Sequence, residues 1–198
     1  ELGYTHICGY DIDHNPKEVL FEDELRPSLK RMNPSASDKA IDAAIFTIKN
    51  KLQGSLVQKN AAFTNYLQNG ITVSIMENGK PSYPIIKLID YENTGNNSFI
   101  VANQWSIVEK ELKRPDIILF INGLPLVVME LKSCSREQVS YSDAYLQLEN
   151  YKRVIPSLFN YNAFCIISDM LTTKAGTITA DENRYSQWKT VNGITRND

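Results

Sequence analysis

The chain has 198 residues, of which 42% are hydrophobic and 22% are charged, and its formal net charge is −2 at pH 7. This composition is typical of a soluble globular domain with a sizeable core. No apolar run approaches the length of a membrane span and the N-terminus has no signal-peptide pattern, so we expect a cytoplasmic protein without membrane contact. The cysteines (Cys8, Cys134 and Cys165) are odd in number and widely spaced, which argues against a disulfide framework or a zinc site.

The first part of the chain is predicted to be helical. A helix is expected from Glu18 to Met32, and it ends there because the residue before Pro34 resists the helical conformation. Ser37 offers an N-cap for a second helix that reaches about Asn50. A short third helix is expected over 59–68, closed by Asn69-Gly70. The candidate core positions of the first helix are Val19, Leu20, Leu25 and Leu29.

The rest of the chain alternates between strands and a helix. Strands are expected over 71–77, 85–91 and 98–109, the last of them irregular near Asn103. A helix over 138–154 precedes short strands over 163–168 and 171–179, and its expected apolar stripe is Tyr141, Tyr145, Leu148 and Ile155. This order predicts a single α/β domain over residues 1–189, with a mixed central β-sheet flanked by helices. The polar residues 190–198 are expected to form a flexible tail.

The segment from Arg114 to Lys132 is predicted to form a hairpin of two apolar strands; its sequence is RPDIILFINGLPLVVMELK. Asn122-Gly123 is a strong turn signal between them. The hairpin also contains Asp116, Glu130 and Lys132. Burial of a lone charge is costly, so charged groups in such a place are usually paired, bound to metal or functional.

The length of the turn decides whether the two carboxylates meet. Glu130 and Lys132 share a strand face because they are two residues apart. A three-residue loop, from Asn122 to Leu124, would set Asp116 directly opposite Glu130. A loop of two or four residues would turn Asp116 to the other face unless a β-bulge corrected the register.

Converging carboxylates at Asp116 and Glu130 would suit Mg²⁺ or Mn²⁺, which prefer oxygen ligands. A metal there can polarise a phosphoryl oxygen and activate water, and Lys132 could stabilise developing negative charge. These are the parts needed to hydrolyse a phosphodiester. The alternative is the end of a surface hairpin with a simple salt bridge between Glu130 and Lys132.

The pair Pro115-Asp116, followed by Glu130-Leu131-Lys132, resembles the PD-(D/E)xK nuclease motif. The whole hairpin is similar, more narrowly, to the N-terminal endonuclease region of the R subunit of type I restriction enzymes. The segment from Gln147 to Tyr151 matches the Q-x-x-x-Y element that this family places after the E-x-K strand. The similarity also covers LRPSLKRMNP (25–34), AIDAAI (40–45), LIDYENTGNNSFIVANQW (88–105) and SDMLTTKAGTITA (168–180).

The resemblance implies a restriction-endonuclease-like fold and a metal-dependent DNA endonuclease domain. Asp116 and Glu130 would bind Mg²⁺, with Mn²⁺ as a possible substitute, and Lys132 would activate or position the attacking water. Gln147 and Tyr151 would position the DNA strand, although their spacing alone favours a surface Gln and a half-buried Tyr. Cleavage would be independent of DNA sequence.

The resemblance also implies partners that this chain does not contain. They are double-stranded DNA, the modification and specificity subunits, and ATP-driven motor domains of a longer subunit. No G-x-x-x-x-G-K-[ST] phosphate loop occurs in these 198 residues, so ATP would be used only by the absent motor domains. A fragment of such a subunit would explain why a DNA enzyme has a net charge of −2, since other domains would grip the DNA.

One part of the nuclease pattern is missing. Such nucleases usually add an acidic residue from a helix that precedes the sheet. Glu1 is a candidate remnant of that helix, and Glu18, Glu22 and Glu24 do not match the motif. The third acidic ligand is therefore unassigned, and the alternative function is a catalytically silent nuclease-like module that binds DNA or couples the motor to partner subunits.

Overall fold

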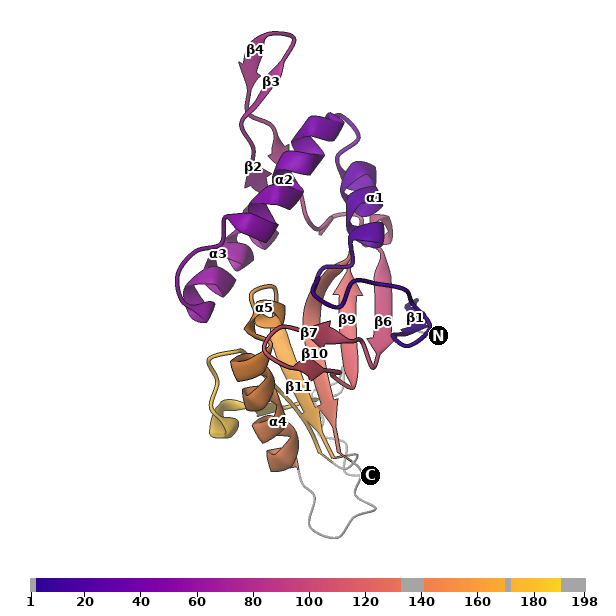
Figure 1. Ribbon diagram of the computed structural model, residues 1–198, viewed down its shortest axis with the longest axis vertical. Coiled ribbons are helices and arrows are strands. Elements are labelled where there is room, and N and C mark those ends of the chain that lie inside the picture. The colour runs from indigo at the N-terminus through magenta and orange to yellow at the C-terminus, as the bar shows by residue number, and fades with distance from the viewer. Residues whose placement is uncertain (1–2, 133–140, 170–171, 190–198) are drawn as a thin grey trace.

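A seven-stranded mixed sheet forms the centre of the protein (Figure 1). The computed structural model describes residues 3–132, 141–169 and 172–189. In spatial order the strands are β1 (Thr5–Cys8), β6 (Phe99–Asn103), β9 (Ile117–Ile121), β10 (Leu124–Leu131), β11 (Phe164–Ser168), β12 (Thr173–Gly176) and β13 (Ser186–Gln187). Two neighbouring pairs, β1–β6 and β10–β11, are parallel and the others are antiparallel. The expected α/β architecture with a mixed central sheet is confirmed.

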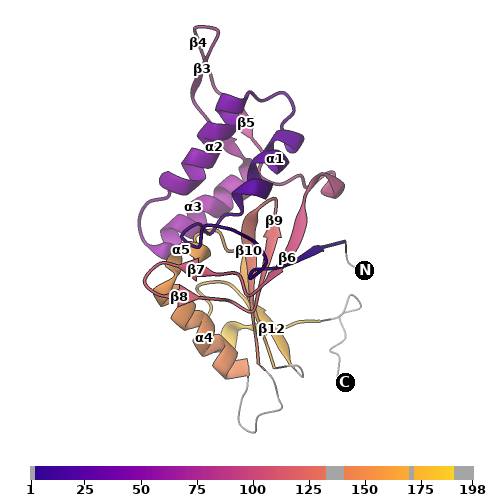
Figure 2. The ribbon, with the colours of Figure 1, turned by 45° about the vertical axis from the view of Figure 1, so that its right-hand side comes forward.

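The helices lie in two groups (Figures 1 and 2). The N-terminal group gathers at one end of the sheet, and the other group runs beside β10 and β11. The first group is α1 (Glu22–Met32), α2 (Asp38–Asn50) and α3 (Leu56–Asn69), and the second is α4 (Tyr141–Val154) and α5 (Pro156–Phe159). The described part of the chain has no helix long and apolar enough to cross a membrane.

In the described residues, three short strand pairs lie outside the central sheet. They are β2 (Ile71–Thr72) with β5 (Ile85–Ile86), β3 (Ile75–Glu77) with β4 (Lys80–Ser82), and β7 (Ile107–Val108) with β8 (Leu112–Lys113). The β3–β4 hairpin projects beyond α2 in both views (Figures 1 and 2). Two 3₁₀ turns, Thr94–Asn96 and Glu182–Arg184, complete the described elements.

The helices expected from the sequence are all present, with shifted ends. Helix α1 begins at Glu22 rather than Glu18, because the backbone N–H of Phe21 donates to the carbonyl of Gly123 over 2.9 Å instead of starting a helical turn. Helix α3 begins at Leu56 rather than Lys59. Ser55 and Gln58 form a capping box there, which sets the start of the helix three residues before the predicted one. Val19, Leu20, Leu25 and Leu29 are all buried, as expected.

Four predicted strands are shorter than expected, and the last of them, expected over 171–179, is Thr173–Gly176. The segment 71–77 is divided into β2 and β3, and only Ile85–Ile86 of the segment 85–91 is a strand. The backbone beyond Ile86 bonds to side chains instead, since the N–H of Lys87 donates to Asn33 and the N–H of Asp90 to Asn97. The segment 98–109 ends as a regular strand at Asn103, where irregularity was expected. The predicted tail over 190–198 lies outside the described residues.

Candidate active site

The two strands of the hairpin are joined by a two-residue turn. Ile121 pairs with Leu124, and the residues between them, Asn122 and Gly123, have φ angles of 53° and 77°. Positive φ at both positions is the signature of a type I′ turn. A two-residue loop alone would have placed Asp116 on the wrong face of the sheet.

A β-bulge at Leu126 restores the register. Pro125 pairs with Phe120 but Val127 pairs with Leu119, so Leu126 is an extra residue on β10. From there the pairing runs regularly to Met129 opposite Ile117. The same register, continued by one residue, sets Asp116 opposite Glu130, and the negative charge of Asp116 acts on Glu130. The sequence left the odd loop and the bulge open as alternatives, and the structure has the bulge.

The turn is anchored to its surroundings. The side chain of Asn122 is buried, its amide donates to the carbonyl of Leu88 and to Asn97, and its oxygen accepts the N–H of Ser98. Gly123 lies against helix α1, where a Cβ atom would be 2.4 Å from the carbonyl oxygen of Phe21. These contacts place the charged end of the hairpin at the end of the sheet away from α1 (Figure 1).

Glu130 is a buried carboxylate, with 3% of its surface exposed. Its Oε1 accepts a hydrogen bond from the ammonium of Lys132 over 2.8 Å, and a quarter of the Lys132 side chain remains exposed. Its Oε2 is buried and has no hydrogen-bond partner among the described residues. Burial raises the pKa of Glu130, the charge of Asp116 raises it further, and Lys132 and the Tyr151 phenol oppose the rise.

The same tripeptide occurs nearby with the opposite environment. Glu111-Leu112-Lys113 repeats the sequence Glu-Leu-Lys and forms the same kind of ion pair, also over 2.8 Å. The Glu111 side chain is 55% exposed, and Lys113 lowers its pKa. Burial, and not the tripeptide itself, therefore separates the Glu130 site from an ordinary surface ion pair.

Asp116 is held from two sides. Its Oδ2 accepts the backbone N–H of Leu131 over 2.9 Å, and its Oδ1 accepts the side-chain amide of Gln104 over 3.2 Å. The backbone N–H of Gln104 also donates to the carbonyl of Asp116. Gln104 belongs to no motif in the sequence, and the one signal for it was the irregularity expected near Asn103.

Helix α4 carries Gln147 and Tyr151 over this face of the sheet. The phenol of Tyr151 lies beside Glu130, and Gln147 lies beside the phenol. Desolvation strongly raises the pKa of Tyr151, so its hydroxyl stays protonated and able to donate.

One expectation about this helix is wrong. The expected apolar stripe omits Tyr151, and its spacing favours a half-buried position, but only 3% of it is exposed. The buried residues of the helix are Ala144, Leu148, Tyr151 and Val154. Of the expected stripe, Leu148 and Ile155 are fully buried, and Tyr141 and Tyr145 pack partly buried against the core. The ring of Tyr151 belongs to the core while its hydroxyl reaches the site, and spacing alone could not reveal such a double role.

The basic residues around the hairpin are largely engaged with the protein. Lys113 pairs with Glu111, and Lys152 pairs with Glu149 and donates to the carbonyl of Ile178. Lys110 donates to a backbone carbonyl, and Arg114 contacts Ser106 and the ring of Tyr10.

The third acidic ligand is not found. In the part of the chain that the structure describes, no group of three or more His, Cys, Asp or Glu residues is arranged to hold a metal ion. Glu22 contacts Lys49, and Glu24 accepts from Ser28. Glu1 and Cys134 lie outside the described residues. His6 and His14 bond to Asn103 and to backbone carbonyls, respectively.

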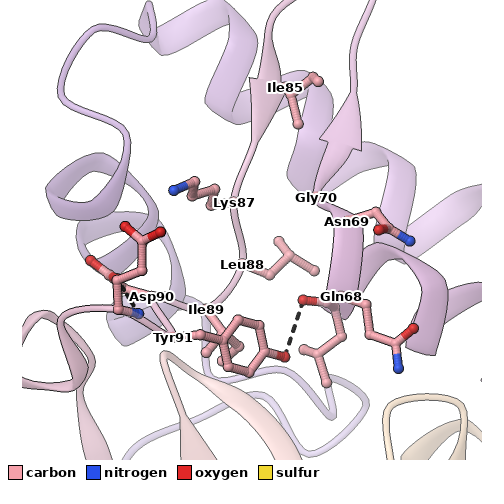
Figure 3. Close-up of a pocket in the computed structure, with 11 residues that line it drawn as sticks. Gln68, Asn69, Gly70, Ile85, Lys87, Leu88, Ile89, Asp90 and Tyr91 are labelled. Atoms are coloured by element: carbon pink, nitrogen blue, oxygen red, sulfur yellow. Dashed lines mark hydrogen bonds between the residues drawn. The ribbon is translucent and has the colours of Figure 1, made fainter.

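A pocket of about 420 Å³ lies elsewhere, between the end of α3 and the segment 85–92 (Figure 3). Its lining includes Lys87, Asp90 and Tyr91, and the Tyr91 hydroxyl donates to the carbonyl of Leu67. Asp90 accepts hydrogen bonds from Asn93 and Asn96 and is part of a loop network. The pocket contains none of the hairpin residues, so it is separate from the carboxylate pair.

The sequence as a whole matches a known family. The family described as the type I restriction enzyme R protein N terminus matches residues 1–184. The chain belongs to this family. The resemblance to the N-terminal region of type I restriction enzyme R subunits is thereby confirmed.

Relatives in this R-protein family are endonuclease subunits. The type I restriction enzyme HindI endonuclease subunit of Haemophilus influenzae is 38% identical over 96% of this chain and 19% of its own length. The putative MjaIXP and MjaVIIIP endonuclease subunits of Methanocaldococcus jannaschii are each 30% identical, over 96% and 84% of this chain. The chain spans less than a fifth of the length of these relatives.

Proposed function

We propose that this R-protein domain is a metal-dependent endonuclease that hydrolyses phosphodiester bonds of double-stranded DNA within a type I restriction-modification enzyme. The observation that carries the proposal is the bulged hairpin, which sets Asp116 opposite the buried Glu130 and pairs Glu130 with Lys132. Such a concentration of charge at the end of an apolar hairpin has a cost in stability, which is usual for a functional site.

Asp116 and Glu130 would hold Mg²⁺, with Mn²⁺ as a substitute. Glu130 has one carboxylate oxygen without a hydrogen-bond partner among the described residues. Mg²⁺ is often bound by one or two carboxylates together with waters and substrate phosphates, so a two-carboxylate set suits it. Once bound, the ion would polarise a phosphoryl oxygen and lower the pKa of a water molecule.

Lys132 would supply positive charge on the solvent side of the site. Its ammonium is anchored by Glu130 over 2.8 Å, while a quarter of the side chain is exposed and can reach a bound phosphate. A fixed ammonium beside the reacting phosphate stabilises the negative charge that develops during hydrolysis. The anchor to Glu130 keeps it there without a large entropy loss on binding.

Tyr151 and Gln147 would position the reacting strand. The Tyr151 hydroxyl stays protonated, so it can donate to Glu130 or to a phosphate oxygen. Neither an amide nor a phenol at this place reads bases when it contacts phosphate. Cleavage independent of sequence fits a complex whose specificity subunit recognises the site and whose motor domains use ATP to move the DNA.

The test is cleavage of supercoiled plasmid with Mg²⁺ or Mn²⁺ by the assembled enzyme. We expect Asp116→Asn, Glu130→Gln and Lys132→Ala each to abolish cleavage and to leave ATP hydrolysis largely intact. Glu111→Gln is the matched control, because it alters the same tripeptide on the surface, and it should cut normally. Robust cleavage by the three site variants would contradict the catalytic role proposed for these residues.

The same assay tests the second candidate function, that of a catalytically silent module that binds DNA or couples the motor to its partners. The observation in its favour is the absence of a third acidic ligand among the described residues. A wild-type complex that binds and translocates DNA but makes no break would establish the silent module and overturn the endonuclease.

A further inference from the structure

Gln104 has an unusual backbone conformation. Among the described residues, the non-glycine residues with positive φ are Asn78, Gln104 and Asn122. Asn78 and Asn122 each precede a glycine in a tight turn, where Asn is a common occupant of this conformation. Gln104, with φ 54°, follows the end of strand β6 and is neither Asn nor Asp, so its conformation is not explained by turn chemistry.

The bend changes which side chains face the core. Ile100 and Ala102 are buried in alternation along β6, and the next buried residue is Trp105 rather than Gln104. Gln104 is therefore not one of the core residues. Its side-chain amide donates to Oδ1 of Asp116 over 3.2 Å, and its backbone N–H donates to the carbonyl of the same residue.

The surroundings hold this conformation firmly. Gly9 lies against the bend, where a Cβ atom would be 2.6 Å from the carbonyl oxygen of Gln104 and 2.7 Å from Cα of Trp105. The ring of His14 stacks on Trp105 with 3.8 Å between centroids, and its Nε2 lies 2.9 Å from the carbonyl oxygen of Ser106. A strained residue that is fixed by so many neighbours is typical of functional sites.

We propose that Gln104 is a positioning residue that sets the orientation of the Asp116 carboxylate for metal binding; the inference rests on the proposed function. The N–H of Leu131 holds only Oδ2, and a carboxylate held at one oxygen can still swing about that contact. The Gln104 amide holds Oδ1 from the other side. Each oxygen keeps a further lone pair, so both contacts are compatible with coordination. Outer partners of this kind fix the direction of a metal ligand.

The test is direct binding of Mn²⁺ to the 198-residue chain without DNA, followed by electron paramagnetic resonance. Gln104→Gly removes the amide and accepts the positive φ without strain. We expect it to weaken Mn²⁺ binding by roughly tenfold or more, as the loss of an outer partner typically does. Asn78→Gly is the control, since it makes the same kind of change at another positive-φ residue far along the fold, and it should bind Mn²⁺ as the wild type does.

Each outcome has a distinct meaning. Wild-type affinity in Gln104→Gly, together with loss of binding in Asp116→Asn, would overturn the positioning role and leave the proposed function in place. Undiminished binding in Asp116→Asn, or no binding by the wild-type chain, would overturn the proposed function itself. Weakened binding in Gln104→Gly with a circular dichroism melt like that of Asn78→Gly would support the positioning role, because a general loss of structure would be excluded.

Discussion

The hydroxyl of Tyr151 lies beside the buried carboxylate of Glu130 while the tyrosine ring packs in the core. Tyr151 of helix α4 thus belongs both to the hydrophobic core and to the site around Glu130. The two parts of the side chain can be separated by mutation, because phenylalanine keeps the ring and removes only the hydroxyl.

We expect Tyr151→Phe to lower the cleavage rate of the assembled enzyme by roughly 10–100-fold, since small losses of positioning have effects of this size. It should reduce the free energy of unfolding by only about 1 kcal/mol, the usual value of one hydrogen bond. Tyr161→Phe is the control, because Tyr161 is also buried and its hydroxyl donates to the carbonyl of Ile48, away from the site. Equal cleavage rates in the two variants would show that the Tyr151 hydroxyl has no positioning role.

Tyr151→Ala should behave differently. Removal of a buried aromatic ring leaves a cavity and typically costs about 3–5 kcal/mol. We therefore expect a large fall in melting temperature, in contrast to the small cost that a position off the apolar stripe would imply. Gln147→Ala, at a half-buried position, should weaken cleavage with a loss of only about 1 kcal/mol. Thermal melts of the two variants make the comparison.

Glu130→Gln should stabilise the metal-free protein near neutral pH. Desolvation raises the pKa of Glu130, so the folded state holds this carboxylate as an anion less readily than the unfolded chain does. The neutral amide removes that cost, and Lys132 can turn to solvent. We expect the melting temperature to rise by roughly 2–4 °C, the shift that about 1 kcal/mol produces in a chain of this size. Glu111→Gln should give no such rise, and a lower melting temperature in Glu130→Gln would contradict the prediction.

Mn²⁺ binding should strengthen with pH. Because the pKa of Glu130 is raised, its proton competes with the metal in the window between the ordinary glutamate value, about 4.3, and the raised value. Affinity should rise as pH increases through that window and then level off. The stability of the metal-free protein should change in the opposite direction, since the contribution of a group with a raised pKa is lost as pH rises through it. Titrations and melts over the same pH series measure both, and an affinity independent of pH would refute the coupling.

Gly123→Ala should be much more costly than Gly79→Ala. Both glycines follow an asparagine in a tight turn, with φ angles of 77° and 76°. The left-handed conformation alone costs an alanine about 1–2 kcal/mol. A Cβ atom at Gly79 would meet nothing within 4 Å, whereas at Gly123 it would be 2.4 Å from the carbonyl oxygen of Phe21. The difference in unfolding free energy between the two variants should exceed about 2 kcal/mol, and similar values would mean that α1 moves aside easily.

Much of the fold could be predicted because its signals are local. Helix α2 begins and ends where Ser37 and Asn50 predicted, and the turn at Asn122-Gly123 formed as its sequence indicated. The helix and strand ends that differ from their predicted positions depend on contacts with residues far away in the sequence. Helix α1 starts late because Phe21 bonds to Gly123, and the strand expected over 85–91 is short because Asn33 and Asn97 take its backbone donors.

The candidate site also has features that the sequence predicts and features that depend on distant contacts. The sequence by itself determined which groups could act together, since Asp116, Glu130 and Lys132 belong to one hairpin and its strand spacing puts Glu130 and Lys132 on one face. Only the tertiary structure decided that the bulge at Leu126 brings Asp116 opposite Glu130. A bulge depends on packing along the whole strand, and no local residue pattern specifies it.

The two Glu-Leu-Lys tripeptides show the limit of local information most clearly. Glu111 and Glu130 are each followed by Leu-Lys and form similar ion pairs, yet the pKa of Glu111 is lowered and that of Glu130 is raised. The difference arises because helix α4 covers Glu130 and excludes water, while Glu111 stays in solvent. The sequence determined the charges, and the tertiary structure determined their solvation, which controls whether a carboxylate serves as a surface ion pair or as a buried, reactive group.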